Sequence, residues 1–124
     1  MPRTRPKHLD LTKIRLPLPA LVSILHRVSG AALFLCMPFL LWLWQESLGS
    51  QQRFEQFKGV ASLWAVKLVL IGLLWAYLHH LCAGIRHLAL DLDIGTELAA
   101  ARASSWAVLV VSLGLTLVAG VMIW

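Results

Sequence analysis

Three long apolar stretches divide the chain, and polar or charged residues flank the first two. They cover about residues 21–45, 63–88 and 103–124. A helix needs about 20 residues to cross the hydrocarbon core of a bilayer, and all three stretches reach that length. No alternation of apolar and polar positions with turn signals competes with them, which argues against a membrane β-barrel. The pattern predicts an all-α integral membrane protein with three transmembrane helices, in which a segment over residues 1–20 precedes a membrane domain over residues 21–124.

Composition agrees with this class. Of the 124 residues, 59% are hydrophobic and 14% are charged. A soluble domain of this length could not bury so much apolar surface, and the excess is expected to face lipid. The first apolar stretch is also too long to be the hydrophobic part of a cleaved signal peptide.

Prolines and cysteines refine the picture of the spans. Pro17 and Pro19 are expected to prevent a helix from continuing out of the N-terminal segment, and Pro38 is expected to bend the first span. Cys36 and Cys82 fall inside the first and second spans. At that depth they are expected to pack as small apolar residues rather than to form a disulfide.

Basic residues are concentrated before the first span, and they predict the orientation. That segment contains Arg3, Arg5, Lys7, Lys13 and Arg15, whereas the next loop contains only Arg53 and Lys58. Basic residues favour the cytoplasmic side, so the N-terminus is expected in the cytoplasm and the C-terminus in the periplasm of a bacterial inner membrane. The same bias accounts for most of the net charge of +5, and no nucleic-acid partner is expected.

A stripe of polar residues ends the second span. His80, Gly84, His87 and Asp91 are three or four residues apart, which places them on one face of a helix. Ionisable groups are rare in membrane helices and indicate a functional site by default. An imidazole beside a missing side chain suits a flat porphyrin, because the imidazole can ligate iron while the glycine leaves space.

A second polar cluster opens the first span. Ser23, His26, Arg27 and Gly30 share a broad helical face. The first and second helices cross the membrane in opposite directions, so the start of one and the end of the other meet at the same leaflet. The two helices together are expected to gather three histidines, Arg27, Arg86 and Asp91 on one side of the membrane.

Each of these residues has a simpler interpretation. Arg27 and Arg86 could extend to lipid head groups, the two glycines could only allow close helix packing, and His87 could bond locally to Asp91. His79 points about 100° away from His80, so the two cannot serve one iron from the same face. Zinc needs three or four close ligands, whereas haem iron needs one ligand on each side, so the spacing favours haem over zinc.

Two motifs give the chain a resemblance to a known family. The segments are Ser23-x-x-His26-Arg27-x-Ser29 and His80-x-x-x-Gly84-Ile85-Arg86-His87-Leu88-x-x-Asp91. The chain resembles the cytochrome b subunits of succinate dehydrogenase, which are the larger of the two membrane anchors of respiratory complex II. The resemblance covers nearly the full length, including the three spans and the basic N-terminus.

The resemblance implies roles that spacing alone does not. His80 would be an axial ligand of haem b iron, with the second ligand supplied by a partner anchor subunit, so that this chain forms half of a heterodimeric haem-binding bundle. Ser23 and Arg27 would line a ubiquinone pocket, while His26, Arg27 and His87 would contact haem propionates or support the site. FAD and iron–sulfur clusters would belong to a flavoprotein subunit and an iron–sulfur subunit, and no catalytic residue of succinate oxidation is expected in this chain.

Two other functions are considered beside a subunit that passes electrons from succinate to ubiquinone. The first is the anchor of a quinol:fumarate reductase, which runs the reaction in reverse. The second is a non-redox membrane scaffold or transporter helper, in which the histidines are structural or bind a transition metal. A haem absorption spectrum would separate the scaffold from the redox subunits.

Overall fold

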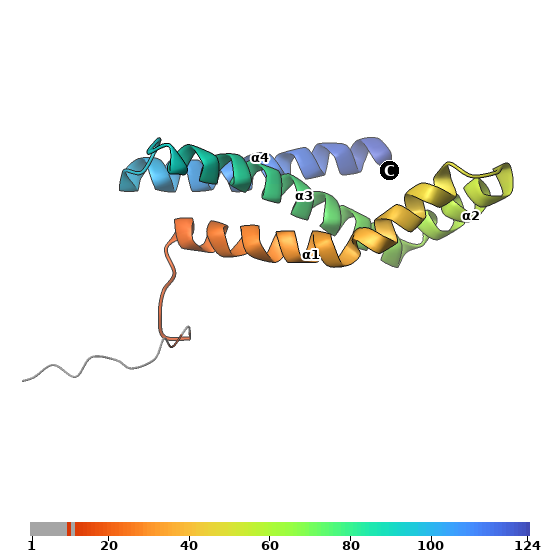
Figure 1. The fold of residues 1–124 in the computed structure, drawn as a ribbon, viewed down its shortest axis with the longest axis horizontal. Coiled ribbons are helices and arrows are strands. Elements are labelled where there is room, and N and C mark those ends of the chain that lie inside the picture. The colour runs from red at the N-terminus through yellow and green to blue at the C-terminus, as the bar shows by residue number, and fades with distance from the viewer. Residues whose placement is uncertain (1–9, 11) are drawn as a thin grey trace, which may run out of the picture.

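The computed structural model describes residues 10 and 12–124, and that part of the chain is helical, without a strand. The helices are α1 (Leu18–Ser47), α2 (Gln51–Ser62), α3 (Trp64–Asp91) and α4 (Leu98–Ile123) (Figure 1). α1, α3 and α4 are long and apolar enough to cross a membrane. The predicted all-α class and its three spans are therefore confirmed. The basic residues Arg3, Arg5 and Lys7 lie outside the described residues.

Prolines control the start and the course of α1, as expected. Pro17 is the N-cap and Pro19 lies in the first turn, where a missing backbone N–H breaks no helical hydrogen bond. Pro38 lies inside the helix, where it removes one hydrogen bond and its ring crowds the preceding turn. Figure 1 shows the second half of α1 turning away from the line of the first half, toward α2. We attribute this bend to Pro38.

The hydropathy pattern does not predict α2, which fills the loop between the first two spans. The Ser50 side chain accepts a hydrogen bond from the backbone N–H of Arg53 at 3.4 Å and so caps the helix. Gly49 allows the tight turn into α2, because a Cβ there would lie 2.6 Å from Cδ of Arg53.

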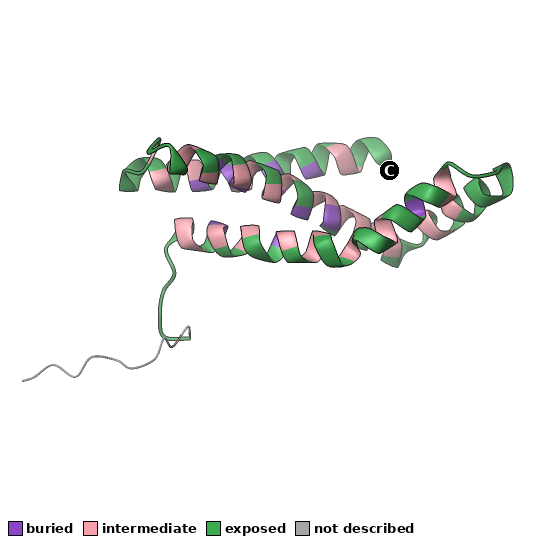
Figure 2. Ribbon diagram, viewed as in Figure 1, coloured by how far each residue is buried: buried purple, intermediate pink, exposed green. Residues whose placement is uncertain are grey.

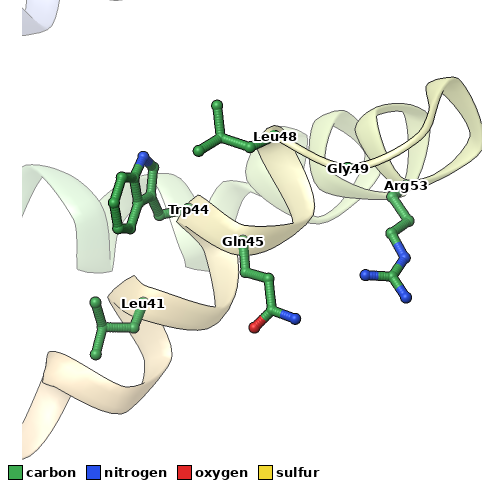
Figure 3. A pocket seen from close by; sticks show the side chains of 6 residues that line it. All are labelled: Leu41, Trp44, Gln45, Leu48, Gly49 and Arg53. Carbon is green, nitrogen blue, oxygen red and sulfur yellow. The ribbon is translucent and has the colours of Figure 1, made fainter.

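A hollow of about 510 Å³ lies at this corner, lined by Leu41, Trp44, Gln45, Leu48, Gly49 and Arg53 (Figure 3). It contains none of the predicted site residues. These belong to the first half of α1 and the last turns of α3.

α3 is the central helix of the bundle and packs against both α1 and α4. The innermost contact joins one small apolar residue from each helix, Val22 of α1, Ala83 of α3 and Val108 of α4. Buried residues lie along these contacts, whereas most outward-facing residues are exposed (Figure 2). The exposed residues include many large apolar side chains on all three long helices. Such a surface suits lipid or a partner helix rather than water.

α4 contacts its neighbours with a stripe of small hydroxyl residues. Ser105, Ser112 and Thr116 are buried and share the face that carries Val108. Each hydroxyl donates to a carbonyl of its own helix, at Ala101, Leu109 and Ser112 respectively, over 2.7–3.2 Å. Because each hydroxyl has a hydrogen-bond acceptor in its own helix, these small side chains allow close helix packing without leaving a polar group unpaired.

Candidate functional site

Three histidines from two helices form a row between α1 and α3. The rings of His26 on α1 and His80 on α3 stack with their centroids 4.2 Å apart and their planes 14° apart. The ring of His87, two turns beyond His80, lies 4.9 Å from that of His26 at 53°. His26 therefore lies between the two histidines of α3. The structure brings the histidines of both predicted clusters together.

The ring of His80 is held on one side by the backbone of α1. Its Nδ1 lies 3.1 Å from the carbonyl oxygen of His26 and 3.2 Å from Oγ of Ser29. A carbonyl oxygen can only accept, so this contact requires the proton of a neutral imidazole on Nδ1. The other nitrogen, Nε2, then carries a lone pair. A metal-ligating histidine commonly has this arrangement, with one nitrogen hydrogen-bonded and the other free to ligate.

A hollow of about 440 Å³ opens beside these rings. Its lining combines the three imidazoles with Gly84 and apolar side chains: His26, His80, Leu81, Gly84, Ile85, His87 and Leu88. Leu81, Ile85 and Leu88 are exposed, so the hollow lies on the outer surface of the α1–α3 pair. This chain therefore supplies one wall of the hollow, and the opposite wall must come from lipid or from another subunit.

The donor set and shape of this hollow fit haem b. His80 offers a free nitrogen, and the apolar lining suits the faces of a porphyrin. A Cβ on Gly84 would meet only Nε2 of His26 at 3.6 Å, an ordinary contact. Packing against α1 therefore does not require a glycine at this position. The absence of a side chain instead leaves space in the hollow next to His80.

The same geometry argues against one iron held by His26 and His80. Axial ligands approach a haem from opposite faces, with their lone pairs aimed at each other through the iron. Stacked, nearly parallel rings at 4.2 Å leave no room for a porphyrin between them. Within residues 10 and 12–124, no three histidine, cysteine or acidic side chains are grouped to hold a metal ion such as zinc.

Ser23 and Arg27 do not line this hollow. Ser23 is half-buried and Arg27 is exposed. Within the described part of the chain, neither side chain forms a hydrogen bond or an ion pair. They lie on α1 within one turn of His26, at the edge of the histidine row.

The comparisons with known proteins agree with this architecture. Residues 1–119 match the model of a family described as succinate dehydrogenase/fumarate reductase transmembrane subunit. The chain belongs to this family.

Individual relatives carry a more specific name. The succinate dehydrogenase cytochrome b556 subunit of Coxiella burnetii is 43% identical over 122 residues, which is 97% of each chain. The subunit of the same name from Paracoccus denitrificans is 35% identical and covers 85% of this chain and 81% of its own. That of Rickettsia felis is 34% identical over 91% of this chain and 88% of its own.

Two predicted members of the polar cluster lie elsewhere in the bundle. Arg86 is only 8% exposed and faces α4, where it donates to Oγ of Ser104 at 2.9 Å and to the carbonyl of Ala101 at 3.3 Å. It neither reaches toward head groups nor joins the histidines. Asp91 is exposed, and no hydrogen bond joins it to His87, although both belong to the described part of the chain. The local pair expected from their spacing is therefore absent.

Two further residues of this chain have environments that spacing did not reveal. His79 is 1% exposed, and its ring packs 5.5 Å from that of Trp75. Neither ring nitrogen of His79 has a hydrogen-bond partner among the described residues. Ser29 is buried against His80, although in the sequence it stood out only as a position of the first motif. Its spacing of three residues from His26 indicates a shared helical face but not the contact with His80.

Proposed function

We propose that this chain is the cytochrome b membrane anchor of a succinate dehydrogenase, which helps bind haem b and ubiquinone and passes electrons from succinate to the quinone. The family match and the shared name of the relatives support the enzyme. One observation carries the haem assignment. Nδ1 of His80 is bonded to the His26 carbonyl, and Nε2 is left free beside a hollow that includes Gly84.

Different residues of this chain would bind different parts of haem b. Bound haem would supply one-electron transfer within the membrane. His80 would hold the iron through Nε2, and the backbone of α1 fixes the plane of the imidazole. His26, Arg27 and His87 would contact the propionates or support the imidazole of His80. Because His26 is stacked on His80, a second ligand would come from a partner anchor subunit, which would also close the hollow.

Ser23 and Arg27 form this chain's part of the quinone site. A serine hydroxyl can donate to a quinone carbonyl, and a guanidinium stabilises the negative charge that develops on that oxygen as electrons arrive. Neither residue has a partner within the described part of the chain, so both are available to a ligand. Their position one turn from His26 keeps the quinone close to the haem side of α1.

The assembly follows from the same assignment. A flavoprotein subunit with FAD and an iron–sulfur subunit with its clusters dock on the cytoplasmic face, and the second anchor subunit lies in the membrane. The chain crosses a bacterial inner membrane with its N-terminus in the cytoplasm and its C-terminus in the periplasm. The family description also covers fumarate reductase, and a preference for succinate oxidation over fumarate reduction in the purified complex decides between the two.

The decisive experiment replaces the proposed iron ligand. In the assembled complex, His80→Ala should abolish the low-spin signal of haem b in optical and electron paramagnetic resonance spectra. His79→Phe is the matched control, because the neighbouring imidazole is buried away from the hollow and phenylalanine retains its aromatic volume. A complex carrying His80→Ala with an unchanged spectrum and a full haem content would overturn the assignment.

A further inference from the structure

The backbone of α1 lies unusually close to His80 at Gly30. A Cβ built on this glycine would lie 2.8 Å from Cε1 of His80 and 3.3 Å from its Nδ1. Real Cβ atoms do not approach other atoms so closely, so any side chain at position 30 would displace the imidazole or separate the two helices. Gly30 therefore sets how deeply the ring of His80 enters the face of α1.

The preceding residue acts on the same edge of the ring. Ser29 is buried, and its hydroxyl donates to the carbonyl oxygen of His26 at 2.8 Å. The hydroxyl oxygen lies 3.2 Å from Nδ1 of His80, and the His26 carbonyl oxygen lies 3.1 Å from the same nitrogen. The single N–H of Nδ1 is thus shared between two acceptors, the His26 carbonyl oxygen and the Ser29 hydroxyl oxygen, which are hydrogen-bonded to each other. This arrangement restricts rotation of the ring and keeps the proton off Nε2.

Other buried hydroxyls of the bundle differ from Ser29. Those of Ser105, Ser112 and Thr116 donate to their own helix, and none of the three is hydrogen-bonded to an ionisable side chain of the described residues. Helix packing alone therefore accounts for those three residues. It does not account for a hydroxyl that bonds its own helix and also the imidazole of a neighbouring helix.

We propose that Ser29 and Gly30 are positioning residues for His80, which set the plane, the depth and the basicity of this imidazole toward haem iron. The proposal rests on the proposed role of His80 as an iron ligand. Gly30 provides the space for the ring edge, and Ser29 shares the Nδ1 proton with the His26 carbonyl. A hydrogen bond donated from Nδ1 makes Nε2 a stronger base, which stabilises the oxidised iron relative to the reduced iron.

Removing the hydroxyl should change the haem without removing it. In the assembled complex, Ser29→Ala leaves Nδ1 with the carbonyl alone, so Nε2 becomes a weaker base and its ring is freer to rotate. We expect the haem reduction potential to rise, the g-values in electron paramagnetic resonance to move, and haem affinity to fall about tenfold, at the lower end of the range for such supporting residues. Ser29→Thr keeps a hydroxyl and should restore all three toward the wild-type values.

Gly30→Ala should have the larger effect, because the added methyl overlaps the ring. We expect loss of the low-spin haem signal, with the complex still oxidising succinate with a soluble dye. Since this variant could fail to assemble, the Ser29 variants carry the test on their own.

Ser112→Ala is the matched control, because it removes another buried hydroxyl, whose only hydrogen bond among the described residues is to its own helix. Identical potential, g-values and haem affinity in Ser29→Ala and Ser112→Ala would overturn the proposal. The His80→Ala variant keeps this outcome separate from failure of the iron assignment. If His80→Ala loses the low-spin haem while Ser29→Ala resembles the control, His80 is the ligand and Ser29 does not position it.

Discussion

Some polar side chains within the spans have hydrogen-bond partners in the chain and others do not. We use this difference to distinguish residues that stabilise the bundle from residues proposed to bind a ligand. Arg86 and the hydroxyls of α4 are hydrogen-bonded inside the bundle. Ser23 and Arg27 have no such partner in the described part of the chain, and His80, whose Nε2 has no hydrogen bond there, lines the hollow between α1 and α3. Unsatisfied groups are costly in a membrane, and they indicate where a ligand or another subunit supplies the missing contacts.

The first prediction concerns the quinone pocket. Ser23→Ala and Arg27→Ala should each lower succinate–quinone reductase activity about a hundredfold or more, because an oriented donor to a developing oxyanion is worth roughly 2.7–4 kcal/mol in the clearest enzyme cases. Electron transfer from succinate to a soluble dye should be unchanged.

Ser47→Ala and Arg53→Ala are matched controls for the quinone pocket. They remove the same residue types at the far end of α1 and at the start of α2. Unchanged quinone reduction in both Ser23→Ala and Arg27→Ala would refute the pocket, whereas an equal loss of dye reduction would locate the defect in assembly.

The second prediction tests the space at Gly84. Gly84→Leu should fill the hollow beside His80 and lower the haem content of the purified complex at least tenfold, while dye reduction by succinate persists. Gly72→Leu is the control on the same helix, because a Cβ on that exposed glycine meets nothing within 4 Å. Haem quantified against protein measures the effect, and a normal haem content in Gly84→Leu would show that the porphyrin lies elsewhere.

For single residues, sequence spacing predicted which side chains share a helix face, but it did not predict which neighbouring side chains they contact. Helical periodicity placed His80, Gly84 and His87 on one face, and all three line one hollow. Arg86 was grouped with them because it lies at the same end of the span, yet its side chain faces α4. Periodicity describes one helix, whereas the neighbour that a face meets depends on how three helices pack. For the same reason, the contact of Ser29 with His80 could not be derived from sequence.

At the scale of elements, the long helices were predictable and the short one was not. Apolar stretches of bilayer length located α1, α3 and α4 to within a few residues, because length and hydrophobicity dominate in lipid. α2 is short and mostly polar, so it carries no comparable signal. The sequence signal that could have indicated α2 is Ser50, a favourable N-cap residue directly before the helix.

The third prediction follows from that cap. Ser50→Ala should destabilise α2 by about 1 kcal/mol, the usual effect of removing a serine N-cap. Amide hydrogen exchange in the first turn of α2 should accelerate roughly fivefold, while α1 and α3 keep their protection. Ser62→Ala is the control, because its hydroxyl bonds the carbonyl of Lys58 at the other end of the helix. Equal exchange in the wild type and Ser50→Ala would show that the cap does not stabilise α2.

At the scale of the whole molecule, the bundle is open on the side that carries the histidine row. The hollow beside the histidines has one wall in this chain, and the stacked rings of His26 and His80 present only one axial ligand. Large apolar side chains, including Leu81, Ile85 and Leu88, are exposed around it. The proposed second anchor subunit would cover this open side.

The fourth prediction concerns this dependence. Expressed without its partner subunits, the chain should contain little six-coordinate haem and should be degraded faster than in the complex, because the second ligand and the covering helix are missing. Haem stoichiometry, ligand-field bands and a pulse-chase half-life measure both effects, and co-expression of the partner subunits should reverse them. Recovery of the single chain with stoichiometric bis-imidazole haem would contradict the prediction and give the second ligand role to His26.

The buried contacts of Arg86 also bear on how the protein enters the membrane. Their acceptors, Ser104 and Ala101, follow Arg86 by 18 and 15 residues, so ribosomes complete α3 before either acceptor exists. An unpaired arginine makes the transfer of a single helix into lipid less favourable. The cost in free energy is up to roughly 2.5–3.5 kcal/mol at the bilayer centre and less near its edge. We therefore expect the translocon to release α3 and α4 into the bilayer together, as one helical hairpin, rather than one after the other.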